Sequence, residues 1–258
     1  MPRLQHGFTS TFDCQQTSLE VKIRSSLRGM SILGLFFDLA GSHLRETNRD
    51  LQVTDESSPE PDDGVEGAEG FASGSDLTGK LLVASPRLSD PSFNRAVVIV
   101  LDHGPIGALG LVLNRPTEVP VDEILAHWHE LAAKTLPAVI FAGGPVSPGA
   151  VIGLVRGRHD VEPAGWHSVL GEVGTVDLSI APDDQPPGLE GVRLFSGYAG
   201  WSASQLDDEV EEGAWFLIDP TESDLLTDSP DTLWHDVLKR QGGDLGLLAN
   251  FPPHPSVN

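Results

Sequence analysis

The character of the sequence changes at Leu77, and this change limits where a fold can form. Residues 41–76 are rich in Glu, Asp, Ser, Gly and Pro and have almost no aliphatic periodicity. Such a segment buries too little apolar surface to offset the entropy of ordering it. From Leu77 onward, apolar β-branched runs alternate with glycine and proline, as in strands joined by turns. We therefore predict a flexible or disordered extension over 1–76 and one folded domain over 77–258.

The first forty residues allow more than one interpretation. Their mixed polarity fits a flexible extension, or a translation start placed upstream of the native one, with Met30 or a later residue as the true start. A short docked helix around Leu27–Leu39 is the alternative. The apolar stretch Met30–Ala40 contains Asp38 and is too short for a membrane span, which needs roughly 20 apolar residues. We predict no membrane association.

The charge balance is strongly acidic. The chain has 16 Lys and Arg against 38 Asp and Glu, a net charge of −22, and from Gly79 onward 10 basic residues face 25 acidic ones. A protein that holds nucleic acid needs clustered Lys and Arg to displace counterions from the phosphates, and no such cluster is visible. We therefore expect no direct nucleic-acid binding, and a protein or small molecule as the partner.

Cysteine and histidine usage points to a reduced compartment. The single cysteine, Cys14, cannot form an intrachain disulfide, and no paired Cys or His residues stand at metal-ligand spacing. We predict a cytoplasmic protein with no metal and no cofactor.

Apolar periodicity after Leu77 predicts more strands than helices. A helix is expected over 119–133, where Val121, Ile124, Leu125, Trp128 and Leu131 are spaced for one face, and another from Ser229 to Gly242. Many strands adjoin without a helical crossover, which favours an α+β fold over a doubly wound α/β fold. The predicted strands span 80–85, 96–102, 107–114, 138–143, 149–157, 174–180, 191–197 and 214–219.

The stretch LFSGYAGWSASQL (194–206) places Tyr198 and Trp201 among small residues. Its glycines allow a sharp turn, and Ser202 with Gln205 matches a capping box that would start a helix ending at Gly213. The structural interpretation is that the two rings pack over this turn. The functional one is an anion site at the helix start, although the acidic residues that follow would repel anions.

Catalytic interpretations of the motifs are weak. GWSAS (200–204) resembles a nucleophile elbow but has Ser204 in place of the second glycine, and the capping box already explains Ser202. His103, in a predicted hairpin loop over 103–106, could shuttle protons, and Arg115 could clamp a carboxylate or pair with a nearby acid. The turn FAGGPV (141–146) has neither the glycine spacing nor the lysine of a nucleotide-binding loop.

Three blocks in register carry a family resemblance: 79–116, 141–149 and 194–219. From about Leu77 to the C-terminus the chain resembles the AlgH/YqgE family, bacterial proteins often labelled transcriptional regulators. Members often have Gly-Pro-Gly where this chain has residues 202–204, which counts against a catalytic Ser202. The positions that match the family's hallmarks are Pro86, Asp90, Phe93, His103, Gly107, Gly110, Asn114, Arg115, Pro116, Gly143, Gly144, Pro145, Val146, Gly197, Tyr198, Gly200, Trp201, Gln205 and Leu206.

The resemblance implies an α+β domain whose strongly bent, mixed β-sheet closes toward a pseudo-barrel and is flanked by a few helices. It implies a cytoplasmic location and brings no established reaction or cofactor. Our first hypothesis is a non-enzymatic binding or regulatory protein that acts through a protein or small molecule. The alternative is a hydrolase-like enzyme with His103 as acid/base and Arg115 as anion clamp. The candidate ligand or partner surface consists of His103, Asn114, Arg115, Gly143, Gly144, Tyr198, Trp201 and Gln205.

Overall fold

A computed structural model of the chain describes residues 76–158, 165–185 and 187–252. The predicted extension over 1–76, including Cys14, lies outside the described residues except for Asp76. Among the described residues, no helix is long and apolar enough to cross a membrane.

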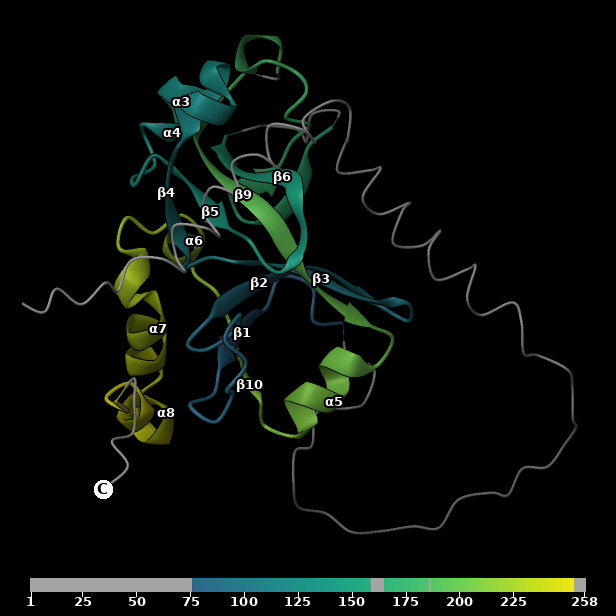
Figure 1. Cartoon of the computed structure of the whole chain (residues 1–258), viewed down its shortest axis with the longest axis vertical. Helices are drawn as coiled ribbons and strands as arrows, with labels where there is room; N and C mark the ends of the chain where they lie inside the picture. The colour runs from purple at the N-terminus through teal and green to yellow at the C-terminus, as the bar shows by residue number, and fades with distance from the viewer. Residues whose placement is uncertain (1–75, 159–164, 186, 253–258) are drawn as a thin grey trace, which may run out of the picture.

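Ten strands form one mixed sheet that is not closed (Figure 1). Its order is β10-β1-β2-β3-β9-β6-β8-β7, and β5 joins β4 to β9 off this path. All pairs are antiparallel except β5 with β9, where Ile140 lies opposite Leu194. The strands are β1 (Leu81–Ala84), β2 (Val97–Gly104), β3 (Gly107–Val112), β4 (Pro116–Pro120), β5 (Val139–Ala142), β6 (Val146–Gly157), β7 (His167–Leu170), β8 (Val173–Thr175), β9 (Leu189–Ser202) and β10 (Trp215–Ile218).

Short helices flank this sheet, which confirms the α+β class. In Figure 1, α3 and α4 cover the end of the sheet near β4 to β6, α5 lies beside β3, and α7 and α8 stand along β1. The helical segments are α3 (Val121–Ile124), η2 (Ala126–Trp128), α4 (His129–Ala132), η3 (Pro182–Asp184), α5 (Gln205–Glu211), α6 (Glu222–Leu225), η4 (Pro230–Thr232), α7 (Leu233–Gln241) and α8 (Gly243–Leu248).

The long strand β9 produces the bend of the sheet. One edge of β9 pairs with β5 at residues 194–196 and then with β3 at residues 199–202. Between these two pairings Gly197 has a φ of 70°, which a residue with a side chain rarely adopts. Because β9 changes partner at this glycine, the sheet divides into a part around β5 and β6 and a part around β1 to β3 (Figure 1).

Most predicted strands are present, and their burial explains why. Val97–Val100 of β2 is buried throughout, as its continuous apolarity predicted. The strand predicted over 174–180 is wrong beyond Thr175, and β4 and β7 were not predicted. The hairpin loop predicted over 103–106 is also wrong, because His103 and Gly104 continue β2 and only residues 105 and 106 form the turn.

The helix predicted over 119–133 is interrupted. Val119 and Pro120 belong to β4, and Leu125 separates α3 from η2 with φ −135° and ψ 72°. The residues predicted to face the core are nevertheless buried, since Val121, Leu125 and Trp128 belong to one core cluster. Burial of the face was therefore predictable, and continuity of the backbone was not.

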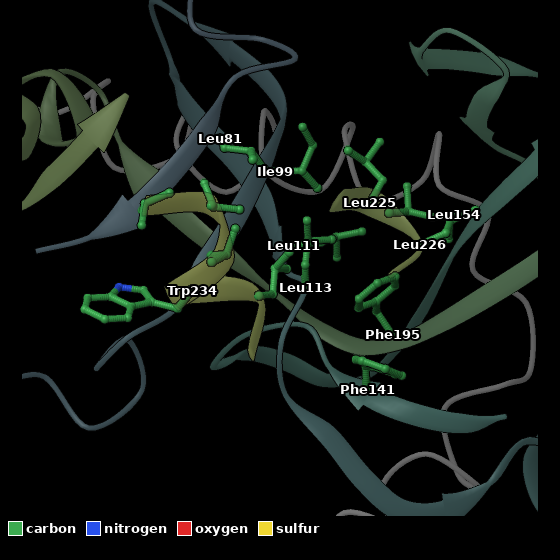
Figure 2. Packing of buried hydrophobic residues seen from close by; sticks show 14 of the residues in the cluster. Leu81, Ile99, Leu111, Leu113, Phe141, Leu154, Phe195, Leu225, Leu226 and Trp234 are labelled. Carbon is green, nitrogen blue, oxygen red and sulfur yellow. The ribbon is translucent and has the colours of Figure 1, made fainter. Parts of the chain in front are cut away.

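The largest core cluster lies between the sheet and the C-terminal helices. Figure 2 shows side chains from the strands, among them Leu81, Leu111 and Phe195, meeting Leu225 of α6 and Trp234 of α7. The indole N–H of Trp234 donates to the carbonyl of Ala84 at 2.8 Å, which fixes α7 against the end of β1. Proline at the first position of η4 and Gly242 after α7 agree with the predicted terminal helix, but Ser229 makes no side-chain cap.

Candidate functional site

A surface pocket of about 410 Å³ lies beside the end of α7 that is nearest β1. This volume is in the range typical of small-molecule sites. Two of the predicted site residues, Asn114 and Arg115, line it. The lining residues come from the turn before β2, the end of β3 and the start of the C-terminal helices: Pro91, Asn94, Arg95, Asn114, Arg115, Asp231, Trp234 and His235.

Asn114 builds the pocket rather than projecting into solvent. Its side chain is 6% exposed, its Oδ1 accepts from the N–H of Val97 at 3.0 Å, and its Nδ2 donates to the carbonyl of Arg95 at 2.9 Å. Arg95 has a φ of 55°, a left-handed conformation that costs a residue with a side chain about 1 kcal/mol or more. The two Asn114 bonds offset this cost, so the amide side chain holds Arg95 at the pocket wall.

Arg115 is half-buried and bonded only to neutral oxygens. Its Nη1 donates to the carbonyl of Asn114 at 3.3 Å, and its Nη2 donates to the carbonyl of Asn94. Burial lowers the pKa of the Arg115 guanidinium from its ordinary value, because the charged form loses hydration. No carboxylate of a described residue lies within 4.0 Å of this guanidinium.

An aromatic cluster fixes the turn that carries Arg95. Phe93 stacks on Trp201 with ring centroids 6.1 Å apart and meets the edge of Trp215 at 5.5 Å. Asp90 begins this turn, with its Oδ1 accepting the N–H of Ser92 at 2.7 Å and its carbonyl accepting the N–H of Phe93. Trp201 is therefore a predicted site residue that supports the pocket from behind and does not line it.

Glu209 of α5 connects the two tryptophans. Its Oε2 accepts from the indole N–H of Trp201 at 3.0 Å and from that of Trp215 at 2.7 Å. Its Oε1 accepts from Nε2 of Gln205 at 2.9 Å. Both rings are almost fully buried, so this carboxylate satisfies donors that would otherwise be left unpaired.

The predicted capping box at Ser202 is half present. The Oε1 of Gln205 accepts the N–H of Ser202 at 3.1 Å, as predicted. The Ser202 hydroxyl donates to that same Oε1 and does not accept from the backbone, and the N-cap of α5 is Ser204, in a left-handed conformation without a side-chain cap. Strand β9 runs on to Ser202, so the helix starts two residues later than the motif indicates.

His103 lies at the other end of strands β2 and β3 from Asn114. Its Nδ1 accepts from the N–H of Leu77 at 3.2 Å, and its Nε2 lies 3.5 Å from Oδ2 of Asp207. The His103 side chain is 8% exposed. Val97, bonded to Asn114, is six residues from His103 along one strand, a separation of about 20 Å. His103 and Arg115 therefore do not share a pocket.

The predicted glycines and Tyr198 lie where the turn after β5 crosses β9. A Cβ on Gly143 would overlap the carbonyl oxygen of Gly197, and one on Gly144 would overlap the backbone at Tyr198. Gly143 also donates to the carbonyl of Ser196 at 2.8 Å. Tyr198 itself is 6% exposed and belongs to the largest core cluster. These residues allow two backbone segments to approach closely.

The eight predicted site residues are thus distributed over four places. Asn114 and Arg115 line the pocket, Trp201 and Gln205 support its turn, and the others lie in the core or at the far end of β2. Sequence reasoning missed the pocket residues Arg95 and Trp234. The guanidinium carbon of Arg95 lies 4.5 Å from the centre of the Trp234 ring, although the two residues are far apart in the chain.

A buried arginine was also missed. Arg193 on β9 is 2% exposed, its Nη2 donates to the carbonyl of Leu136 at 2.6 Å, and its guanidinium stacks on the ring of Phe141. Burial lowers the pKa of Arg193 to about 10, partly opposed by the charge of Asp228. Among the described residues, no partner accepts from its Nε or Nη1.

The described residues offer no obvious metal site. Within 76–158, 165–185 and 187–252, no group of three or more His, Cys, Asp or Glu residues has the arrangement that could hold an ion. A second, larger pocket of about 550 Å³ lies between the start of the turn after β1 and the end of α5, with Arg87, Asp90 and Glu212 among its lining residues.

Known proteins are similar to this chain in sequence, and two solved structures are similar to it in fold. A UPF0301 protein of Streptomyces coelicolor is 47% identical over 193 residues, covering 73% of this chain and 99% of the relative. A UPF0301 protein of Mycobacteroides abscessus is 40% identical over 205 residues, covering 77% of this chain and 98% of that protein. A crystal structure of a protein from Corynebacterium diphtheriae superimposes with a TM-score of 0.62 at 28% identity, over 67% of this chain and 91% of the other.

The solution structure of the AlgH protein from Pseudomonas aeruginosa is similar over 74% of this chain and all of its own, with a TM-score of 0.50 and 27% identity. The family model described as AlgH-like matches residues 81–246, which contain the whole β-sheet, α5, α7 and every residue that lines the pocket. The agreement of motifs, sheet and relatives shows that this chain belongs to the AlgH-like family.

Proposed function

We propose that this chain is a non-enzymatic binding or regulatory protein, and that it binds its partner, a small molecule, at the pocket lined by Asn114 and Arg115. The observation that carries the proposal is the half-buried Arg115, which lines a pocket of about 410 Å³ and has only neutral carbonyls as partners. Burial removes part of the hydration of this cation, and a ligand anion that pairs with it compensates for that loss.

The geometry does not favour the enzyme hypothesis. That hypothesis joins His103 to Arg115 in one reaction, but the two lie at opposite ends of β2 and β3. The side chains lining the Arg115 pocket include no serine, threonine or cysteine that could act as a nucleophile. The observed contacts of His103 are structural: its Nδ1 accepts from Leu77 at the start of the folded domain, and its Nε2 lies near Asp207 of α5.

A regulatory role in the cytoplasm is part of the proposal, and it would act without direct contact to DNA. The excess of acidic residues from Gly79 onward opposes binding to a polyanion. Of the basic residues, Lys80, Arg158 and Arg240 are already paired with carboxylates. A gel-shift titration of the full chain in moderate salt tests this point: tight, salt-sensitive binding to duplex DNA would contradict it.

The binding proposal is tested by a thermal-shift screen of the full chain against a library of small metabolites. A ligand at about 100 times its dissociation constant stabilises the folded state by about 2.7 kcal/mol, which corresponds to roughly 5–10 °C for a domain of this size. The screen is repeated with Arg115→Gln, which keeps an amide donor for the carbonyls but removes the charge.

Arg87→Gln serves as the control, because Arg87 is exposed and lines the second pocket. We expect ligands that stabilise the wild type and the Arg87→Gln variant but not Arg115→Gln. A screen without any stabilising ligand, or one in which all ligands act equally on Arg115→Gln, contradicts the proposal. Turnover of a library compound that is abolished by His103→Ala in a folded variant would support the enzyme hypothesis instead.

A further inference from the structure

Two arginines line the same pocket without a carboxylate partner. Arg95 lies before β2 and Arg115 lies after the neighbouring strand β3. No described Asp or Glu side chain lies within 4.0 Å of either guanidinium. The chain has a net charge of −22, yet two arginines and a single acidic residue, Asp231, line this pocket.

Neutral groups hold both guanidiniums in place. Nη2 of Arg95 donates to the carbonyl of Phe251, and its planar group lies over the Trp234 ring at 4.5 Å. Arg115 donates to the carbonyls of Asn94 and Asn114. An arginine has five N–H donors, so these bonds orient each group and leave donors for a ligand. Groups that are already oriented lose less entropy when a ligand binds.

The backbone also positions these groups in advance. Arg95 keeps its left-handed conformation because buried Asn114 bonds its carbonyl and the N–H of Val97. Phe93, two residues earlier, is fixed between Trp201 and Trp215. A strained residue that surrounding contacts hold in place is frequent at ligand sites. Arg95 is therefore fixed from both sides of its turn.

The remaining lining groups limit the shape and charge of a ligand. Exposed Pro91 offers apolar surface next to the arginines, whereas Trp234 is 3% exposed and lies beneath the Arg95 guanidinium. Asp231 is exposed at the pocket and has a like charge to an anion, and the Nδ1 of His235 lies 2.9 Å from Oδ1 of Asp236. One acidic group among the lining residues weakens anion binding but does not cancel two guanidiniums.

We infer that this pocket binds the carboxylate or phosphate group of a small ligand through the guanidiniums of Arg95 and Arg115. The inference rests on the proposed function and adds to it the chemical class of the ligand. Guanidinium groups bind these oxyanions through paired, charge-assisted N–H···O bonds, which is the interaction that both arginines lack in this structure.

Three matched probes test the inference on the full chain. Benzoate has the carboxylate, phenyl phosphate has the phosphate, and benzamide has the same ring without a charge. Binding is followed by titration of amide chemical shifts in the pocket and of tryptophan fluorescence. We expect benzoate or phenyl phosphate to bind saturably and benzamide to bind at least about tenfold more weakly, as loss of a charge-assisted contact implies. The stronger of the two anions identifies the group that the pocket prefers.

Substitutions at the pocket then assign the contacts. Arg95→Gln and Arg115→Gln should each weaken the better anion about tenfold or more, and Arg115→Lys, which keeps the charge, should weaken it less. Asp231→Asn should tighten binding several-fold by removing the like charge. Arg87→Gln, at the second pocket, should leave the affinity unchanged.

Binding of benzamide as tight as that of the better anion, or full affinity in both glutamine variants with intact fold, overturns the inference. If neither anion binds while the metabolite screen yields an uncharged ligand that needs this pocket, the inference fails and the proposed function stands. If the screen and the probes all fail, both are wrong.

Discussion

Replacement of Glu209 by alanine should destabilise the domain more than any other acidic-to-alanine change on α5. The carboxylate accepts from two buried indole N–H groups at 3.0 and 2.7 Å and from Gln205 at 2.9 Å. A hydrogen bond to a charged acceptor contributes about 1.5–3 kcal/mol when buried, and partial exposure of Glu209 reduces this. Two indole bonds therefore give an expected loss of about 2–3 kcal/mol.

The assay is urea denaturation of the full chain, followed by tryptophan fluorescence and by far-ultraviolet circular dichroism. With a denaturant slope of about 2–3 kcal/mol per molar urea, the midpoint should fall by roughly 1 M. Glu211→Ala is the matched control, because Glu211 is exposed on the same helix and should change stability by no more than about 0.5 kcal/mol. A midpoint for Glu209→Ala equal to that of the control would refute this account of the aromatic cluster.

Two further substitutions test other parts of the fold. The Asp224 carboxylate accepts hydrogen bonds from Nη1 and Nη2 of Arg240 at 2.7 and 2.8 Å. Burial raises the pKa of Asp224, but the hydrogen bonds from Arg240 and Thr221 outweigh burial. The pKa of Asp224 therefore lies below its ordinary value of 3.8. Asp224→Asn should therefore lower the free energy of unfolding by about 1–3 kcal/mol above pH 3.8. This loss of stability should shrink as the pH falls through the lowered pKa of Asp224. Denaturation curves of both proteins at neutral and at strongly acidic pH measure the loss. Gly144→Ala should lower the free energy of unfolding by about 3 kcal/mol or more, or prevent folding, because the new Cβ would overlap the backbone at Tyr198. Gly104→Ala is the control, because the space around Gly104 is open, and this variant should melt nearly as the wild type does in thermal denaturation.

Strands that are buried on both faces were predictable because their sequences are continuous apolar runs. Leu81–Ala84 and Val97–Val100 are fully buried and read as continuous apolar runs. The short strand at His167–Leu170 has two exposed residues and two partly buried ones, so its sequence has no comparable signal. The break at Leu125 was not predictable from periodicity, because a buried stripe at helical spacing remains buried when the backbone deviates for one residue.

The candidate site was predictable only in part. Asn114 and Arg115 are adjacent in sequence and end a predicted strand, so they were found, but their partner Trp234 lies in a helix that reaches the pocket through tertiary packing alone. His103 has the residue type expected of a site, yet the strand places it about 20 Å away from Asn114. A sequence motif gives the order of residues, and the register of the hairpin decides which of them meet.

Several positions that resemble the family's motifs have a supporting function in this structure. Asp90 starts the turn, Phe93 anchors it between Trp201 and Trp215, and Asn114 bonds its end at Arg95. None of these contacts requires a ligand, yet together they fix the backbone of Arg95, which lines the same pocket as Arg115. Under our proposal this support lowers the entropy lost when an anion binds, and Phe93 also packs against the aromatic core cluster of the domain. In our proposal these positions form the frame of a binding site, not a set of catalytic residues.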